Sequence, residues 1–230
     1  MITVYPYDSL GYANYGWLKT HHHFSFAEYH NPNRMGFGTL RVINDDTISP
    51  GTGFDLHSHR DMEIITYVRQ GAITHDDNHG NQGKTKAGNV QVMSAGTGIS
   101  HAESNEESEK TIVYQIWIKP RRKDLPPKWL THSFPTMAVK DKLHLLVSGD
   151  GAAPLTINQD AYIYAGTLSQ GQKIKHPIHH QAYVLASKGS FTLDKHTLNQ
   201  GDGAEVINQT MITITANEAC EILIIDVPSD

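Results

Sequence analysis

The sequence predicts an all-β protein built as two tandem barrels. Runs rich in β-branched and aromatic residues recur about every eight to twelve residues, with Gly-, Asn- and Asp-rich turns between them, a spacing typical of sandwiches and barrels. Within the 230 residues, the second half repeats the order of strands and glycine-containing turns of the first. We therefore expect one barrel in residues 1–130 and a second, divergent barrel in residues 131–230.

The first twenty residues mix tyrosine and tryptophan with glycine and asparagine. That composition favours an arm that packs on another element over an independent unit. Strand-like sequence follows at residues 24–27, 37–44, 62–69, 72–76, 90–94 and 112–118. Only residues 105–110 suggest a short helix, and an acidic loop between strands is the alternative.

Prolines interrupt the strand pattern between residues 119 and 136. Proline lacks a backbone N–H and has a fixed φ angle, so we interpret this segment as a linker without a regular element. Trp129 within it is expected to pack on a domain face. The basic residues at 119 and 121–123 could form a nucleic-acid patch, but the overall negative charge of the chain favours a solvated linker. Strand patterns then resume at residues 143–147, 154–157, 161–168, 182–186, 190–193, 204–207, 211–215 and 221–227.

Composition limits the class of protein. Hydrophobic residues make up 38% and charged residues 19%, as in soluble globular domains. No apolar run approaches the ~20 residues that a membrane span needs, and a net charge of −5 argues against direct nucleic-acid binding. The single cysteine, Cys220, excludes an internal disulfide and fits a reducing, cytoplasmic compartment. We expect it to be a buried strand residue, and we expect the protein to be a monomer.

Two short motifs offer metal ligands at alternate positions, His57-Ser58-His59 and His101-Ala102-Glu103. Alternate side chains of a β-strand leave the same face, so each motif directs two ligands to one side. Two such strands facing each other inside a barrel could hold one ion with three imidazoles and one carboxylate. That set fits a divalent transition metal: iron is the first expectation, and manganese, cobalt, nickel, copper and zinc are possible.

The sequence around these motifs resembles a known family. Residues 24–29 read Phe-Ser-Phe-Ala-Glu-Tyr, residues 61–68 read Asp-Met-Glu-Ile-Ile-Thr-Tyr-Val, and residues 93–103 read Met-Ser-Ala-Gly-Thr-Gly-Ile-Ser-His-Ala-Glu. Together with Tyr-Gln-Ile-Trp-Ile at 114–118, they resemble bacterial members of the pirin family, in the cupin superfamily. The resemblance implies two cupin barrels, and metal ligands at His57, His59, His101 and Glu103.

Other acids and histidines near the motifs have alternative interpretations. Wider cupins often use an acid at the position of Glu63, which here is either a residue beside the metal or a solvated strand residue. His22 matches a family histidine and could lie near the metal pocket, although a surface or hydrogen-bonded structural role is favoured. His75, Asp76 and Asp77 border a turn, and we interpret them as exposed turn residues rather than ligands.

The second half offers His176, His179 and His180 as candidate ligands. No acid stands at the matching spacing, and no histidine occupies the position equivalent to His101. We therefore expect the second barrel to hold no metal, as the resemblance also implies.

The resemblance implies a quercetin 2,3-dioxygenase, which opens the central ring of a flavonol with O₂. In this hypothesis the metal binds the flavonol hydroxyl, and Glu103 stays bound or takes up its proton as the general base. The alternative is a metal- or redox-sensing regulatory protein that binds a protein partner, as described for eukaryotic pirins.

Overall fold

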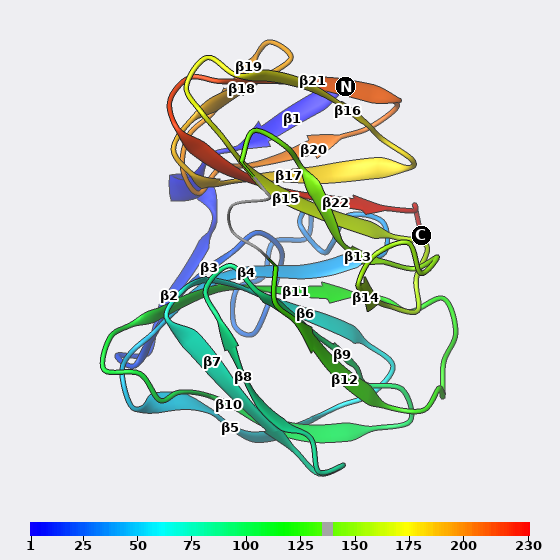
Figure 1. The fold of residues 1–230 in the computed structure, drawn as a ribbon. Helices are drawn as coiled ribbons and strands as arrows, with labels where there is room; N and C mark the ends of the chain where they lie inside the picture. The colour runs from blue at the N-terminus through cyan, green and yellow to red at the C-terminus, as the bar shows by residue number, and fades with distance from the viewer. Residues whose placement is uncertain (135–139) are drawn as a thin grey trace.

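The computed structural model describes residues 1–134 and 140–230 and shows two β-barrels stacked on one another (Figure 1). Within these ranges the strands form four sheets, a seven-stranded and a four-stranded sheet in each barrel. The prediction of an all-β protein of two tandem barrels is confirmed. The described residues include one short 3₁₀ helix, η1 (Tyr7–Ser9), and no helix long and apolar enough to cross a membrane.

The barrel that carries most of the first half lies at the bottom of Figure 1. Its larger sheet has the order β12-β9-β6-β11-β4-β3-β2 and its smaller sheet the order β5-β10-β7-β8. In chain order its strands are β2 (Gly11–Asn14), β3 (Leu18–His22), β4 (Leu40–Ile48), β5 (Thr52–His59), β6 (Glu63–Gln70), β7 (Ala72–Asp77), β8 (Gln82–Lys86), β9 (Val90–Ser94), β10 (Ile99–Asn105), β11 (Thr111–Ile118) and β12 (Lys128–His132).

The other barrel has a larger sheet of order β1-β20-β17-β22-β15-β13-β14 and a smaller sheet of order β16-β21-β18-β19. Its strands are β1 (Ile2–Tyr5), β13 (His144–Ser148), β14 (Leu155–Thr156), β15 (Tyr162–Leu168), β16 (Lys173–Pro177), β17 (Gln181–Lys188), β18 (Phe191–Leu193), β19 (His196–Leu198), β20 (Gly203–Val206), β21 (Met211–Ala216) and β22 (Cys220–Val227).

The two larger sheets pack face to face and share one core. Alternate residues of a strand leave opposite faces, so a central strand can serve two cores at once. In β17, Tyr183 and Leu185 join the core between the barrels, whereas Ala182 and Val184 join the core inside the upper barrel. This double burial explains why β17 and β22 are almost continuously apolar.

Strand β1 crosses from the first half of the chain into the upper barrel, where Val4 pairs with Ala204 of β20. The expected N-terminal arm is therefore confirmed for β1. The proposed boundary between residues 130 and 131 falls inside β12, which pairs with β9 of the lower barrel. Division into two units at that position stays a proposal.

Three local predictions are wrong. Residues 24–27 form no strand, and an isolated bridge between Phe26 and Tyr29 closes a tight turn there instead. Residues 106–110 form a loop after β10, so the acidic-loop alternative holds and the helix does not. The segment predicted as a linker contains the edge strand β12. Pro126 and Pro127 precede this strand, and its five residues are not proline, so each has a backbone N–H group and the strand can pair with β9. Pro135 lies outside the described residues. Cys220 is buried, as expected.

Candidate metal centre

Strands β5 and β10 supply the predicted ligands. They are hydrogen-bonded neighbours in one antiparallel sheet, with His57 opposite His101. The expectation that the two strands face each other across the barrel is therefore wrong. A register shift between His101 and Glu103 places Glu103 opposite Phe54. Directly opposed residues of antiparallel strands have close side chains, so pairing brings the histidines together without a contact across the lumen.

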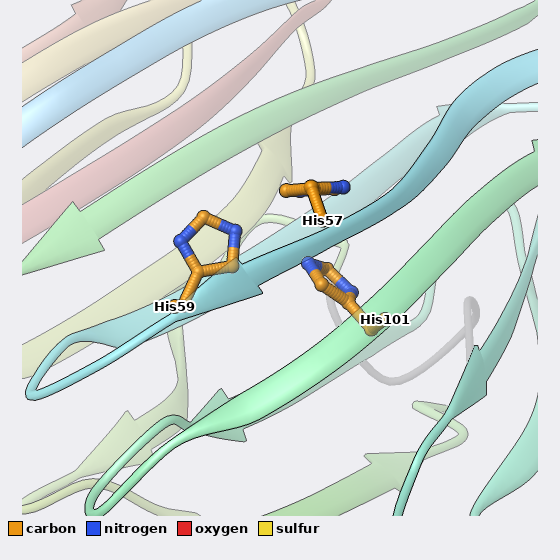
Figure 2. A group of neighbouring side chains, drawn as sticks. All are labelled: His57, His59 and His101. Atoms are coloured by element: carbon orange, nitrogen blue, oxygen red, sulfur yellow. The ribbon is translucent and has the colours of Figure 1, made fainter.

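The three histidine side chains gather over this strand pair (Figure 2). Their ring centroids are 4.5 Å apart for His57 and His101, 4.8 Å for His57 and His59, and 5.1 Å for His59 and His101. One nitrogen from each ring lies within 4.8 Å of one nitrogen from each of the others. His101 is buried, His59 is partly buried, and His57 is exposed.

The state of the rings suits metal binding. His57 Nδ1 lies 2.7 Å from the backbone oxygen of Asp55, an acceptor that orients the ring. Burial and the neighbouring His57 lower the pKa of His59 to about 4, and burial with the adjacent histidines lowers the pKa of His101 to about 3. The buried Nε2 of His101 has no hydrogen-bond partner. Neutral imidazoles with an unpartnered nitrogen are what a divalent transition metal binds, so these residues fit the ion that the sequence predicted.

Glu103 lies on the same strand face as His101, and its side chain is 2% exposed. Its carboxylate accepts hydrogen bonds from the amides of Gln91 and Gln115 and, at 3.3 Å, from the hydroxyl of Thr66. Burial raises the pKa of Glu103 to about 7, and these three donors act in the opposite direction. Its oxygens form a second candidate donor group with His75 and His101, not with His57 and His59. Its role as the fourth ligand therefore stays a prediction.

Two of the uncertain residues lie in unexpected places. Glu63 is 2% exposed, accepts a 2.5 Å hydrogen bond from Ser94 and receives a backbone hydrogen bond from Asn158 of the second half. It therefore joins the two barrels, and the interpretation as a solvated residue is wrong. His22 is buried, its Nδ1 lies 2.8 Å from Asn44 Oδ1, and it lines the pocket at the metal centre. It is hydrogen-bonded and near the pocket at once, and the surface interpretation is wrong.

The interpretation of residues 75–77 as exposed turn residues is wrong: all three lie in β7, and only Asp76 is exposed. His75 is completely buried and Asp77 is 6% exposed, because β7 continues through Asp77 and directs both side chains inward. The i, i+2 spacing of His75 and Asp77 at the end of the predicted strand 72–76 was the available signal, and it is the same spacing that predicted the metal ligands. In the second barrel, His176 is buried with its ring 4.5 Å from Tyr164, while His179 and His180 are exposed. A metal-free second barrel stays a prediction.

A pocket of about 440 Å³ opens beside the histidines. His57, His59, His101 and Glu103 all line it, and it falls within the range of about 300–1,000 Å³ common for small-molecule sites. Its other lining residues that matter here are aromatic or polar: Trp17, Phe26, Phe54, Trp117, Thr20, Asn44, Asp46 and Gln115. Sequence reasoning missed these residues, since their convergence requires strands β3, β4, β5 and β11 to be closed into a barrel.

Trp117 connects the aromatic wall to the ligands. Its ring lies edge-on to His59 at 4.9 Å, and its Nε1–H donates to Gln115 Oε1 at 3.2 Å. Gln115 in turn donates from its amide nitrogen to Glu103. The wall of the pocket and the carboxylate are therefore held by one hydrogen-bonded chain.

Comparison with known proteins gives a consistent result. Residues 5–118 match the family model Pirin, and residues 145–227 match the model Quercetinase C-terminal cupin domain. A pirin-like protein of Caulobacter vibrioides is 48% identical over 98% of this chain and 99% of its own length. The quercetin 2,3-dioxygenase of Escherichia coli K12 is 38% identical over 99% of each chain. The crystal structure of the bacterial pirin YhhW from Escherichia coli in complex with nickel(II) superposes with a TM-score of 0.94, at 38% identity over 100% of both chains.

Proposed function

Because the chain belongs to the pirin family, we propose that it is a metal-dependent dioxygenase that opens the central ring of a flavonol with O₂. The observation that carries the proposal is the three-histidine cluster in the wall of an aromatic-lined pocket. Relatives named quercetin 2,3-dioxygenase support the choice of substrate. The described residues of the pocket offer no serine or cysteine nucleophile that would favour a hydrolytic reaction.

His57, His59 and His101 would hold the metal, with Glu103 as the fourth ligand. When bound, a divalent transition ion supplies Lewis-acid and redox chemistry toward a chelating substrate and O₂. Iron is our first expectation. The nickel complex of YhhW supports a site that accepts more than one ion, in line with the general overlap of affinities among N and O ligand sets.

The pocket suits a flat aromatic substrate. Trp17, Phe26, Phe54 and Trp117 present broad apolar surfaces that exclude water and can stack on a planar ring system. Polar groups of the same pocket, including Asn44 and Asp46, can orient hydroxyl groups on the substrate.

We expect Glu103 to accept the proton of the flavonol hydroxyl. Its carboxylate lines the pocket, and its hydrogen-bond donors Gln91, Gln115 and Thr66 are all neutral. No side-chain cation is paired with the carboxylate in these contacts, so only the metal itself would compete with the proton, and Glu103 would leave the ion when it takes the proton up. Transfer to a carboxylate within reach is ordinary general-base catalysis.

The test is a metal-reloading experiment. The protein is stripped of metal, reloaded separately with Fe²⁺, Mn²⁺, Co²⁺, Ni²⁺, Cu²⁺ and Zn²⁺, and mixed with quercetin in air. Loss of the flavonol absorbance and uptake of O₂ are followed together. We expect turnover with at least one ion, loss of turnover in His59→Ala, and retention in His196→Ala, which changes a histidine of the second barrel. Ring opening that persists in His57→Ala and Glu103→Ala with unchanged metal content would reject the proposal.

Unchanged quercetin with every ion would favour the regulatory alternative. A pull-down that differs between metal-loaded and metal-stripped protein would then support a metal-dependent partner, and an identical result would remove that idea. A monomeric protein and a cytoplasmic location complete the proposal, and sedimentation and cell fractionation check them.

A further inference from the structure

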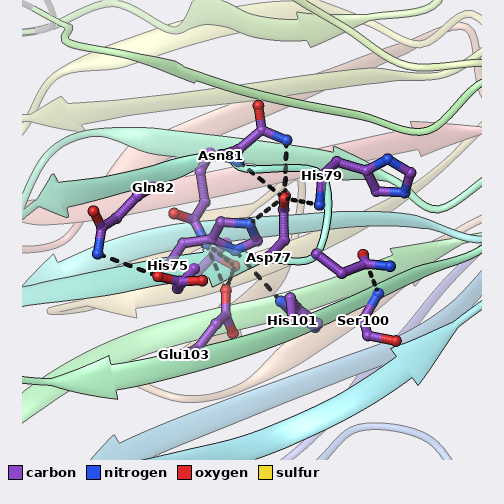
Figure 3. Close-up of polar contacts among 12 residues, drawn as sticks. His75, Asp77, His79, Asn81, Gln82, Ser100, His101 and Glu103 are labelled. Carbon is purple, nitrogen blue, oxygen red and sulfur yellow. Dashed lines mark hydrogen bonds and ion pairs between the residues drawn. The ribbon is translucent and has the colours of Figure 1, made fainter.

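Asp77 is surrounded by hydrogen-bond donors. The backbone N–H groups of His79 and Asn81 lie 2.9 and 3.0 Å from its Oδ1, and the side-chain amide of Asn81 lies 2.9 Å from its Oδ2 (Figure 3). The same amide also lies 3.1 Å from Oδ1, and the third residue in contact with the carboxylate is His75, whose Nε2 lies 3.0 Å from Oδ2. A carboxylate that only accepts from amides has no proton to give, so the Nε2 of His75 must carry the hydrogen in that contact.

This assignment determines, one after another, which of the remaining ring nitrogens of His75 and His101 carry a hydrogen and which carry a lone pair. A neutral imidazole has one N–H and one lone pair, so His75 presents its lone pair at Nδ1. That atom lies 3.4 Å from Nδ1 of His101 (Figure 3). His101 must therefore donate from Nδ1, which leaves its lone pair on Nε2. The Nε2 of His101 is the buried atom that has no hydrogen-bond partner.

The His75 ring is held in the orientation that this chain requires. Trp129 of β12 stacks on it with a centroid distance of 4.8 Å and an angle of 8° between the planes. Trp129 fits there because residue 83, opposite His75 on β8, is glycine: a Cβ atom at Gly83 would lie 2.6 Å from the indole ring. The indole of Trp129, from the larger sheet, and the missing side chain at Gly83, in the smaller sheet, thus allow this stacked orientation of the His75 ring.

We propose that Asp77 and His75 are positioning residues for the metal centre, which fix His101 in the tautomer whose Nε2 can bind the ion. The inference rests on the metal site of the proposed function and adds a part that the ligand set does not include. His75 does not itself bind the ion, since Asp77 occupies one of its nitrogens and His101 the other. A metal-binding histidine commonly donates its other ring N–H directly to a carboxylate. Here His75 lies between the predicted ligand His101 and the carboxylate of Asp77.

The first test measures Zn²⁺ affinity by competition with a chromophoric chelator. Asp77→Asn replaces the carboxylate by an isosteric amide that can still accept from the 79–81 backbone. We expect about 10- to 100-fold weaker binding, the usual cost of removing a group that orients a ligand. Asp76→Asn is the matched control: Asp76 precedes Asp77 on the same strand, is exposed, and contacts Gln82. It should bind Zn²⁺ as the wild type does.

The second test separates positioning from general damage to the fold. His75→Gln keeps a donor toward Asp77 and an acceptor toward His101, whereas His75→Leu keeps neither, so His75→Gln should bind Zn²⁺ more tightly than His75→Leu. Long-range ¹H–¹⁵N NMR of the imidazoles reports the protonated nitrogen of each ring directly. In the wild type we expect the proton of His101 on Nδ1 and that of His75 on Nε2, and in Asp77→Asn we expect this single pattern to be lost.

Two results would overturn the inference: a proton on Nε2 of His101 in the metal-free wild type, or wild-type Zn²⁺ affinity in both Asp77→Asn and His75→Leu. A wild-type protein that binds no metal would instead refute the metal centre of the proposed function. Quercetin turnover enters neither measurement, so a different substrate would leave the positioning inference intact.

Discussion

His23 provides a test of how the fold depends on pH. Its side chain is 1% exposed, its Nδ1 lies 3.0 Å from the hydroxyl of Tyr183, and Arg34 donates to its backbone oxygen. Burial, reinforced by the nearby positive charge of Arg34, lowers the pKa of His23 from 6.5 to about 3. The folded protein therefore keeps this ring neutral at pH values where the unfolded chain protonates it.

The sign and size follow from proton linkage. Between pH 6.5 and about 3 the unfolded state binds one more proton at this residue, so stability is complete above pH 6.5 and is lost as the pH falls. One pKa unit corresponds to about 1.4 kcal/mol. Acidification from pH 6.5 to pH 5 should thus remove about 2 kcal/mol of unfolding free energy through His23 alone. His23→Gln keeps an acceptor for Tyr183, does not titrate, and should abolish this part of the loss.

The assay is urea denaturation of metal-free protein at pH 7, 6 and 5, followed by tryptophan fluorescence. The free-energy difference between His23→Gln and wild type should shift in favour of the variant by about 2 kcal/mol over this range. His30→Gln, the same change at an exposed position, should leave the pH dependence of wild type unaltered. Parallel acid dependence in wild type and His23→Gln would refute the assignment of a buried neutral histidine.

Three further predictions use other parts of the fold. Arg34→Met removes one partner of the Arg34–Glu205 pair, in which Arg34 is buried and Glu205 half-buried, and should cost about 3 kcal/mol in urea denaturation, the low end for a buried pair. A double variant with Glu205→Gln that costs the full sum of the single changes would argue against a coupled pair. Gly96→Ala should destabilise by more than Gly51→Ala, since both have positive φ but only at Gly96 would a Cβ meet a backbone oxygen, that of Leu125, at 1.9 Å; equal losses of thermal stability would contradict this. When the free metal concentration is 100 times the dissociation constant of the site, removal of the metal should lower the unfolding free energy by about 2.7 kcal/mol. A melting temperature that does not change when chelator is added would count against a metal site in the native state.

The sequence alone determined the fold class and most strands of both barrels. Short apolar runs rich in β-branched and aromatic residues, such as residues 112–118 and 221–227, form β11 and β22, because a strand buried on both faces is recognisable from its local composition. The short edge strands β8 and β12 were not predicted. The sequence of β8 is polar and β12 follows two prolines, so pairing with a neighbouring strand, and not their own composition, makes them strands. The histidine motifs could be recognised from local sequence too, because residues i and i+2 of a strand share one face.

What only the tertiary structure decided is which faces meet. Strand adjacency placed His57 opposite His101, and closure of the barrel turned His75 and Asp77 inward behind His101. The burial of Glu63 needed the second barrel, whose Asn158 backbone reaches it. Local periodicity predicts only which residues share one face of a strand. The register between two strands determines which residues lie opposite each other, and that register depends on long-range packing.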